Sequence, residues 1–180
     1  MSPSAPDQLD TPTPADGDTS RRREFTWNDP MVTALGGINL DGMAALQAIM
    51  DGTLPAPPIA HALGFELVTA EPGHATFAFE PAEYHYNPIG SVHGGVFATL
   101  LDSAAGCAVH SMLPAGVRYT TLDLNVKYLR AITVGTGRVT AVGTVTHLGG
   151  RTALAEARLL DPADRLLATA TSSCLIIRPA

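Results

Sequence analysis

The sequence predicts an α+β domain in which an antiparallel sheet wraps around one long central helix. Three observations lead to this prediction. An apolar run over residues 96–109 has the length and the alanine and leucine content that favour a helix over a strand. Two strand patterns precede this run, and four longer ones follow it. The connections between the later strand patterns are short, so their strands are expected to run antiparallel.

The composition narrows the class of protein. A chain of 180 residues suggests one domain with a substantial core. Its formal net charge of −6 disfavours a nucleic-acid or anionic-membrane partner. The two cysteines, Cys107 and Cys174, lie in apolar runs without the spacing of a metal site or a disulfide framework. The N-terminus has no signal-peptide pattern, and no run reaches the roughly 18 apolar residues of a membrane span. We therefore expect a cytoplasmic protein that binds neither nucleic acid nor membrane.

Three regions are expected along the chain. Residues 1–24 are rich in proline, serine, threonine and aspartate without periodicity, which predicts a disordered tail. Residues 25–58 form an N-terminal extension, in which the helical spacing of apolar residues over 39–50 predicts one short helix. The proline-rich segment 54–58 reads as a rigid connection and ends the extension. The main domain is then residues 59–180.

The main domain contains six expected strands. Residues 64–70 and 74–79 read as strands separated by the turn 71–73. The later strand patterns lie near residues 117–129, 135–147, 151–160 and 165–177. Polar and apolar residues alternate over 136–147, as in a sheet with two distinct faces. Residues 147–150 and 161–164 are short enough to be hairpin loops.

The start of the central helix is a candidate binding site. Asn87-Pro88 and Gly90 mark a tight loop, and the helix is expected to begin near His93. The first amides of a helix lack partners within the helix and lie at the positive end of its dipole. Because Gly94-Gly95 has no Cβ atoms, an anionic ligand or a developing oxyanion can approach these amides closely. The same glycines could also simply permit a tight strand-to-helix junction.

One acid, Asp102, lies within the apolar run of the central helix. It could cap a second helix that starts at Ser103 or face solvent, or it could act as a general base or nucleophile. Asp102 follows Gly95 by seven residues, which places it on about the same face but roughly 10 Å further along the axis. One helix therefore cannot offer both groups to one atom. If both act on the same carbonyl, two antiparallel copies must share each site in a symmetric homodimer.

Together these residues resemble the PaaI-like acyl-CoA thioesterases of the hotdog-fold superfamily. The resemblance covers about residues 60–178 and continues through the strand segments 121–132, 137–161 and 166–177. Its central motif is N-P-x-G-x-x-H-G-G with an acid nine residues after the histidine, formed here by Asn87, Pro88, Gly90, His93, Gly94, Gly95 and Asp102.

The resemblance implies a hotdog fold and a hydrolase that splits an acyl- or aryl-CoA thioester into the free acid and coenzyme A. It also implies a homodimer with shared active sites, and such dimers usually pair into a homotetramer. Coenzyme A enters as part of the substrate, and no separate cofactor or metal is expected. The acyl group itself stays open, since the sequence does not distinguish an aromatic from a branched or long-chain group.

The resemblance also assigns roles to single residues. The Gly94 amide would donate to the thioester oxygen, and Asp102 would act as base or nucleophile. Asn87 would lie near the thioester, although it could merely close an Asx turn. His93 would orient the loop or the substrate rather than transfer a proton. Thr121 would position the water molecule, although threonine is common on strands in any case.

A second acid lies two residues after Thr121. In a regular strand, Asp123 and Asn125 share the face of Thr121 because side chains alternate. Asp123 is therefore expected to be a back-up acid in case Asp102 is structural.

Coenzyme A carries phosphates, so its site needs cations at the mouth. Arg130 and Arg151 are the candidates, and the resemblance places their two segments at the nucleotide end. Both could also be ordinary solvated arginines. The expected substrate-binding residues are Gly95, Tyr128, Arg130, Gly150, Arg151 and Thr152.

Two other functions stay open. A non-catalytic acyl-CoA-binding protein would keep the pocket and the arginines without hydrolysis. An enoyl-thioester hydratase on the same fold would need a catalytic histidine paired with an acid on the helix, which His93 is poorly placed to supply. The six histidines lack the spacing of a metal site, and no G-x-S-x-G elbow indicates a serine hydrolase.

Overall fold

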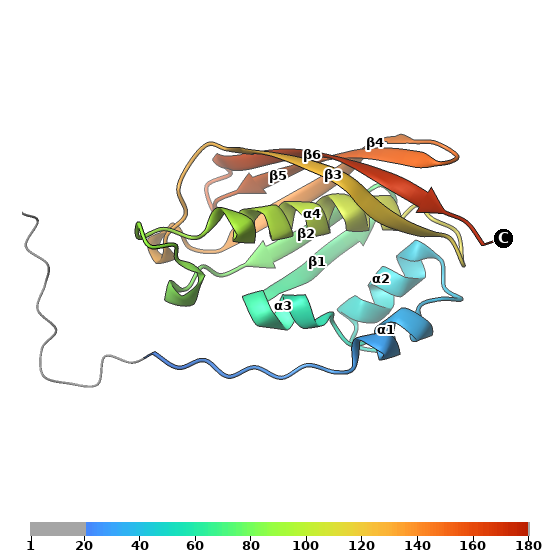
Figure 1. The fold of residues 1–180 in the computed structure, drawn as a ribbon, viewed down its shortest axis with the longest axis horizontal. Coiled ribbons are helices and arrows are strands. Elements are labelled where there is room, and N and C mark those ends of the chain that lie inside the picture. Colours follow the sequence, from blue (N-terminus) through green and yellow to red (C-terminus); the bar gives the residue numbers. More distant parts are fainter. Residues whose placement is uncertain (1–20, 180) are drawn as a thin grey trace, which may run out of the picture.

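The computed structural model describes residues 21–179, and its centre is one six-stranded sheet that arches over a long helix, α4 (Figure 1). The strands are β1 (Phe65–Glu71), β2 (His74–Phe79), β3 (Arg118–Tyr128), β4 (Val139–Leu148), β5 (Thr152–Leu160) and β6 (Leu166–Ile177). They follow the order β1-β2-β4-β5-β6-β3, and every neighbouring pair is antiparallel. β1 and β3 are therefore the two edges of the sheet.

The helices are α1 (Pro30–Gly36), α2 (Gly42–Met50), α3 (Pro58–Leu63) and α4 (Gly94–His110), with short 3-10 turns at Glu83–His85 and Val134–Thr136. All six expected strands and the central helix are present. The expected strand near 135–147 begins only at Val139, because residues 134–136 form the second 3-10 turn. Within residues 21–179, no helix has the length and apolarity that a membrane crossing requires.

The core lies between α4 and the concave face of the sheet. Leu101, Ala104, Ala105, Ala108 and Val109 are fully buried, and their spacing forms one broad stripe of α4 that faces the strands. Alternate residues of β5 complete the core from the sheet side. The sheet therefore holds α4 in place and leaves one narrow, half-exposed face of this helix open.

Gly143 on β4 sets the distance between sheet and helix. A Cβ atom at this position would lie 2.1 Å from the carbonyl oxygen of Ala104 on α4, so only glycine fits. We expect Gly143→Ala to lower the free energy of unfolding by about 1–3 kcal/mol, because the clashing atoms belong to backbone that cannot rotate away. Urea denaturation checks this value. Gly135→Ala is the matched control, since its Cβ would make only an ordinary contact at 3.7 Å.

The N-terminal extension contains two helices where one was expected. Asp29 caps α1 by accepting from the Met31 amide at 2.9 Å, and Pro30 occupies the first turn. The expected helix over 39–50 corresponds to α2, which Asp41 caps through the Ala44 amide at 2.8 Å. The predicted tail, residues 1–24, lies outside the described residues except for 21–24, which are neither helix nor strand.

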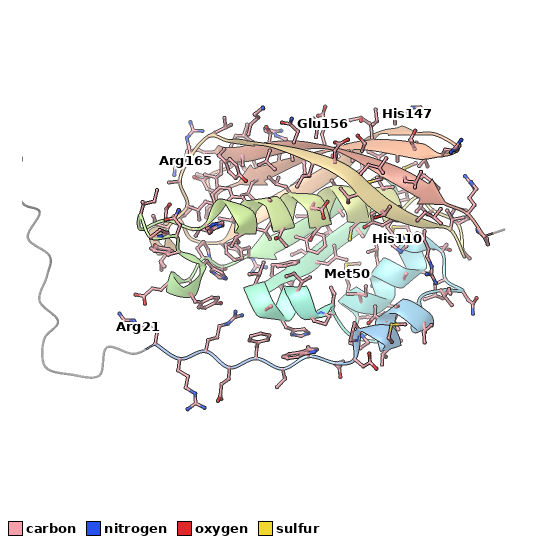
Figure 2. The ribbon with its side chains drawn as sticks, in the orientation of Figure 1. Arg21, Met50, His110, His147, Glu156 and Arg165 are labelled. Atoms are coloured by element: carbon pink, nitrogen blue, oxygen red, sulfur yellow. The ribbon has the colours of Figure 1, made fainter. Side chains whose placement is uncertain are left out.

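The extension is fixed to the end of the central helix. The Gly42 amide donates to the Leu113 carbonyl at 2.9 Å, and a Cβ atom on Gly42 would lie 1.6 Å from the His110 carbonyl oxygen. Figure 2 shows His110 beside this end of α2. The backbone of α2 thus rests directly on the last turn of α4, and Figure 1 shows the helices α1 to α3 beyond β1, at that edge of the sheet.

Candidate active site

The loop before α4 is closed by one side chain. The Oδ1 atom of Asn87 accepts from the amides of Ile89 and Ser91 at 3.1 and 3.2 Å, and its Nδ2 atom donates to the Ser91 hydroxyl at 3.2 Å. Asn87 therefore stabilises the turn, which is the structural role that the sequence left open. Its expected role beside the thioester stays a prediction.

The first turn of α4 leaves one backbone donor free. His93 is the N-cap, and its Nδ1 atom accepts from the Gly95 amide at 2.9 Å. The Val96 amide donates to the His93 carbonyl at 2.9 Å. Among residues 21–179, the Gly94 amide has no acceptor, so of the two glycines Gly94 is the one that can serve an added ligand. His93 thus orients the helix start, and its expected role toward the substrate stays a prediction.

Tyr128 holds the start of α4 against β3. Its hydroxyl donates to the Gly94 carbonyl at 3.1 Å, and its ring packs edge-on against Phe97 with a centroid distance of 5.5 Å. A shallow pocket of about 300 Å³ opens here. It is lined by Ser91, Val92, Gly94, Phe97, Tyr128, Leu129, Arg130 and Ala131.

Asp102 and Thr121 are joined by a hydrogen bond between α4 and β3. Asp102 is half-buried on α4, and the Thr121 hydroxyl on β3 donates to its Oδ1 atom at 2.9 Å. The hydrogen bond fixes the carboxylate, and its second oxygen accepts no hydrogen bond from residues 21–179. The interpretation of Asp102 as the cap of a second helix is wrong, because α4 continues without a break to His110.

Asp123 lies on the other face of the sheet, so the prediction that it shares the face of Thr121 is wrong. The pairing of β3 with β6 shifts between Thr121 and Asp123, and Leu122 is the extra residue of a bulge. The shift turns Asp123 outward, where it accepts from the Ser173 hydroxyl at 2.6 Å. Asn125 turns outward with it, while Leu124 packs toward the core. Asp123 therefore cannot replace Asp102.

The residues expected to bind coenzyme A fall into two separate groups. Arg130 lines the pocket beside Gly94, and its guanidinium donates to the Leu166 carbonyl at 2.6 Å. Gly150, Arg151 and Thr152 lie at the β4–β5 turn, where the Arg151 carbonyl accepts from Ile176 at 2.8 Å. Leu166 and Ile176, which contact the two groups, lie at opposite ends of β6 and are ten residues apart. The two groups are therefore about 30 Å apart within one chain.

Neither cysteine is suited to be the nucleophile. Burial raises the pKa of the Cys107 thiol to about 12, and the nearby charge of Asp102 adds to the shift. Burial also raises the pKa of Cys174, which lies opposite Thr121 on β6. Both groups stay protonated near neutral pH, as expected of core residues. Among the described residues, no cluster of three or more histidine, cysteine or acidic side chains is arranged to hold a metal ion.

Tyr119 supports α4 but was not singled out from the sequence. Tyr119 lies on β3 and packs against α4 at Gly106, where a Cβ atom would come within 2.5 Å of its hydroxyl. Burial raises the pKa of Tyr119 well above its ordinary value, so the phenol stays neutral. The signal was Gly106 itself, since a glycine inside a helical pattern usually has a packing reason.

Comparison with known proteins agrees with this geometry. A family model described as the thioesterase superfamily matches residues 89–168. The 1,4-dihydroxy-2-naphthoyl-CoA hydrolase of Listeria monocytogenes is 30% identical over 105 residues, which are 58% of this chain and 84% of that enzyme. This chain belongs to the thioesterase superfamily. A second relative, from Halobacterium salinarum, is 44% identical over 77 residues, which are 42% of this chain and only 49% of the relative. The chain thus spans about half of that protein's length.

Solved structures share the fold of this thioesterase superfamily member. A mutant structure of the phenylacetic acid degradation protein PaaI from Thermus thermophilus is 28% identical, with a TM-score of 0.60. The match covers 68% of this chain and 99% of that one. The predicted hotdog fold and the predicted PaaI-like thioesterase family are confirmed. The relative from Listeria monocytogenes is named as a hydrolase of a CoA thioester, which is the class of enzyme that the sequence predicts.

Proposed function

We propose that this protein hydrolyses acyl- or aryl-CoA thioesters to the free acid and coenzyme A, in sites shared by two copies of the chain. The observation that carries the proposal is the pair of groups that α4 presents. One is the Gly94 amide, which lacks an acceptor among the described residues, and the other is the Asp102 carboxylate, which Thr121 holds at 2.9 Å. A thioester hydrolase needs such a donor for the oxygen and such a base for the water.

The distance along α4 favours a shared site. Asp102 follows Gly94 by eight residues, or about 12 Å along the axis, so one chain cannot place both groups on one carbonyl. The partner would bind along β3, whose outer edge pairs with no described strand. The half-exposed face of α4 is also suited to close approach of a second helix, because its residues are small: Gly95, Ala98, Thr99 and Ser103.

The contacts of α4 with β3 define the expected arrangement. Gly94 lies beside Tyr128 and Asp102 beside Thr121, so helix and strand run in opposite directions. If Tyr128 of one copy lies opposite Thr121 of the other, the two-fold axis passes near Leu124 and Asn125. Gly94 of each copy then approaches Asp102 of the other.

The same two-fold axis would bring together, from two copies of the chain, the residues expected to bind coenzyme A. Arg130 lies near the C-terminal end of β3, and Arg151 lies at the opposite end of the sheet. An antiparallel partner reverses these ends, so Arg130 of one copy comes to the same end as Arg151 of the other. Their positive charges would then face the phosphates of one coenzyme A. The tetramer implied by the resemblance would pair two such dimers.

The proposed chemistry uses residues of the chain alone. The Gly94 amide donates to the thioester oxygen and stabilises the negative charge that develops on it. Asp102 takes a proton from water while the water oxygen bonds to the carbonyl carbon, or its free carboxylate oxygen attacks that carbon directly. When Asp102 acts as the base, the carbon–sulfur bond then breaks, the free acid leaves, and the proton taken from water passes to the sulfur of coenzyme A. When Asp102 attacks directly, breaking this bond leaves a mixed anhydride on Asp102, which water hydrolyses to the free acid and the original carboxylate, and a proton from that water passes to the sulfur. Coenzyme A enters as part of the substrate, and the proposed steps use no separate cofactor.

A panel of acyl- and aryl-CoA esters tests the proposal. We expect the purified full-length protein to release free coenzyme A from at least one ester, as detected by a thiol-trapping reagent. Saturable binding of every ester without thiol release would instead indicate a non-catalytic acyl-CoA-binding protein. Loss of the enoyl-CoA absorbance without thiol release would indicate a hydratase. Either result would overturn the proposed hydrolysis.

A further inference from the structure

His85 is a buried histidine that the proposed chemistry does not use. It lies in the 3-10 turn before the loop that leads to α4, and only 3% of its surface is exposed. The Ala82 amide donates to its Nδ1 atom at 2.9 Å, so the ring hydrogen is on Nε2. The Nε2 atom donates to the Leu63 carbonyl at 2.8 Å, 22 residues away in the chain. Both ring nitrogens therefore have a partner, and one of them ties His85 to the end of α3.

The backbone of His85 holds the residue that caps α4. Its carbonyl accepts from the His93 amide at 2.8 Å, which makes these two residues the base of a small hairpin, 85–93. His93 is the N-cap of α4, and its side chain accepts from the Gly95 amide at 2.9 Å. The Gly94 amide lies between these two contacts in the chain. Its position therefore depends on where His85 holds His93.

The end of α3 is the anchor of this arrangement. His61, Ala62 and Leu63 form the last turn of this helix, where backbone carbonyls have no partner within the helix. Arg23 of the N-terminal extension donates to the carbonyls of His61, at 2.8 Å, and Ala62. His85 donates to the third carbonyl, that of Leu63. The extension and the hairpin 85–93 are thus bound to successive residues of one helix end.

Two aromatic rings enclose the imidazole of His85. The ring centroids of Phe79 and Tyr84 lie 4.6 and 4.1 Å from that of His85. The Arg23 guanidinium lies over the outer face of this group, 4.0 Å from the centre of the Tyr84 ring. Burial lowers the pKa of His85, and the nearby charge of Arg23 adds to the shift. The ring therefore stays neutral near neutral pH and keeps the one donor and one acceptor that its two bonds require.

We propose that His85 is a positioning residue, whose bond to the Leu63 carbonyl sets where the Gly94 amide meets the thioester oxygen. An amide stabilises a developing charge only from a fixed position. The other ring bond of His85 spans three residues and shapes only the turn, whereas the bond to Leu63 joins the hairpin to the domain. The Val92 amide, which donates to the Ile132 carbonyl at 2.8 Å, holds the other strand of the hairpin, so loss of the Leu63 bond shifts the hairpin without releasing it. The assignment rests on the proposed thioesterase activity.

Three substitutions of His85 separate the two ring nitrogens. Glutamine can place its amide nitrogen near Nε2 and keep the bond to Leu63, asparagine can place its oxygen near Nδ1 and keep only the bond from Ala82, and phenylalanine keeps neither. We expect kcat per folded protein to fall about 10–100-fold in His85→Asn and His85→Phe, to stay within about threefold in His85→Gln, and KM to change little. A merely structural histidine would lower the folded fraction and leave this kcat unchanged. His110→Phe, which replaces a half-buried histidine at the other end of α4, is the matched control and should keep the wild-type kcat.

An NMR spectrum of protein labelled with ¹⁵N-glycine gives a readout that does not depend on hydrolysis. The cross-peak of Gly94 is identified by its loss in Gly94→Ala. We expect it to move in His85→Asn and to stay in place in His85→Gln and His110→Phe. If no thioester is cleaved but this pattern holds, the proposed hydrolysis fails and the positioning of the amide stands. The role of His85 is overturned if the cross-peak stays in place in His85→Asn, or if folded His85→Asn keeps the wild-type kcat. Should His85→Asn not fold, His85→Phe, which keeps the ring packing, takes its place in both tests.

Discussion

Replacing Asp102 with asparagine is expected to lower kcat for acyl-CoA hydrolysis by roughly 10²–10⁴-fold. Asparagine has nearly the same shape, and its side-chain oxygen can still accept from the Thr121 hydroxyl, which lies 2.9 Å from the Asp102 carboxylate. The fold should therefore persist. The amide, however, can neither take a proton from water nor attack the thioester. The rate of thiol release for wild type and variant under saturating substrate checks this expectation.

Asp123→Asn is the matched control for this experiment. It removes an acid two residues along β3 from Thr121, but the carboxylate of Asp123 lies on the outer face, where Ser173 binds it at 2.6 Å. We expect this variant to keep a rate within about twofold of the wild type. Equal rates for wild type and Asp102→Asn would remove Asp102 from the mechanism. A large loss of activity in Asp123→Asn alone would indicate that the base is Asp123, on the outer face of the sheet.

Gly94→Pro is expected to lower kcat by roughly 10²–10³-fold, because proline has no amide hydrogen to offer the oxyanion. The helix should tolerate the change. Gly94 is the first residue of α4, a position that favours proline, and His93 before it has the extended conformation, with φ −61° and ψ 136°, that a residue before proline adopts. Gly94→Ala keeps the amide and adds only a Cβ atom 3.3 Å from the Tyr128 ring, so it should keep most of the activity.

Mixing the two inactive variants tests whether the sites are shared. In a mixed dimer, one site combines the Asp102 of the Gly94→Pro chain with the intact Gly94 amide of the Asp102→Asn chain. Random pairing makes half of the dimers mixed, each with one intact site, so co-expression should restore about one quarter of the wild-type activity. Activity no greater than that of the separate variants would overturn the shared site, and sedimentation of the protein as a monomer would do the same.

The sequence predicted the fold well wherever the structure depends on local pattern. The glycine pair lies at the start of α4 and Asp102 within it, as turn residues and helical length predicted, because these signals are local. Thr121 was singled out only through the family resemblance, and the catalytic roles of all these residues stay predictions. The joining of Thr121 to Asp102 follows once α4 is packed against β3. Six strands and their antiparallel order were likewise apparent from alternation and short loops.

The errors came from features that spacing does not encode. A bulge at Leu122 shifts the register by one residue, and nothing in the alternating pattern of β3 marks it, so Asp123 was assigned to the wrong face. Helix α1 was missed because its seven residues bury no side chain and leave no amphipathic pattern. The separation of Arg130 from Arg151 depends on which end of the sheet each turn occupies, which only the assembled strand order reveals.

The bare contact between Gly143 and the backbone of α4 makes the packing of this helix on the sheet rigid. With a hypothetical methyl only 2.1 Å from the Ala104 oxygen, the helix has no slack against the sheet, so the groups on it that we propose for catalysis hold constant positions. Under the proposed function, a different acyl group would then be accommodated by exchange of side chains rather than by a shift of the helix.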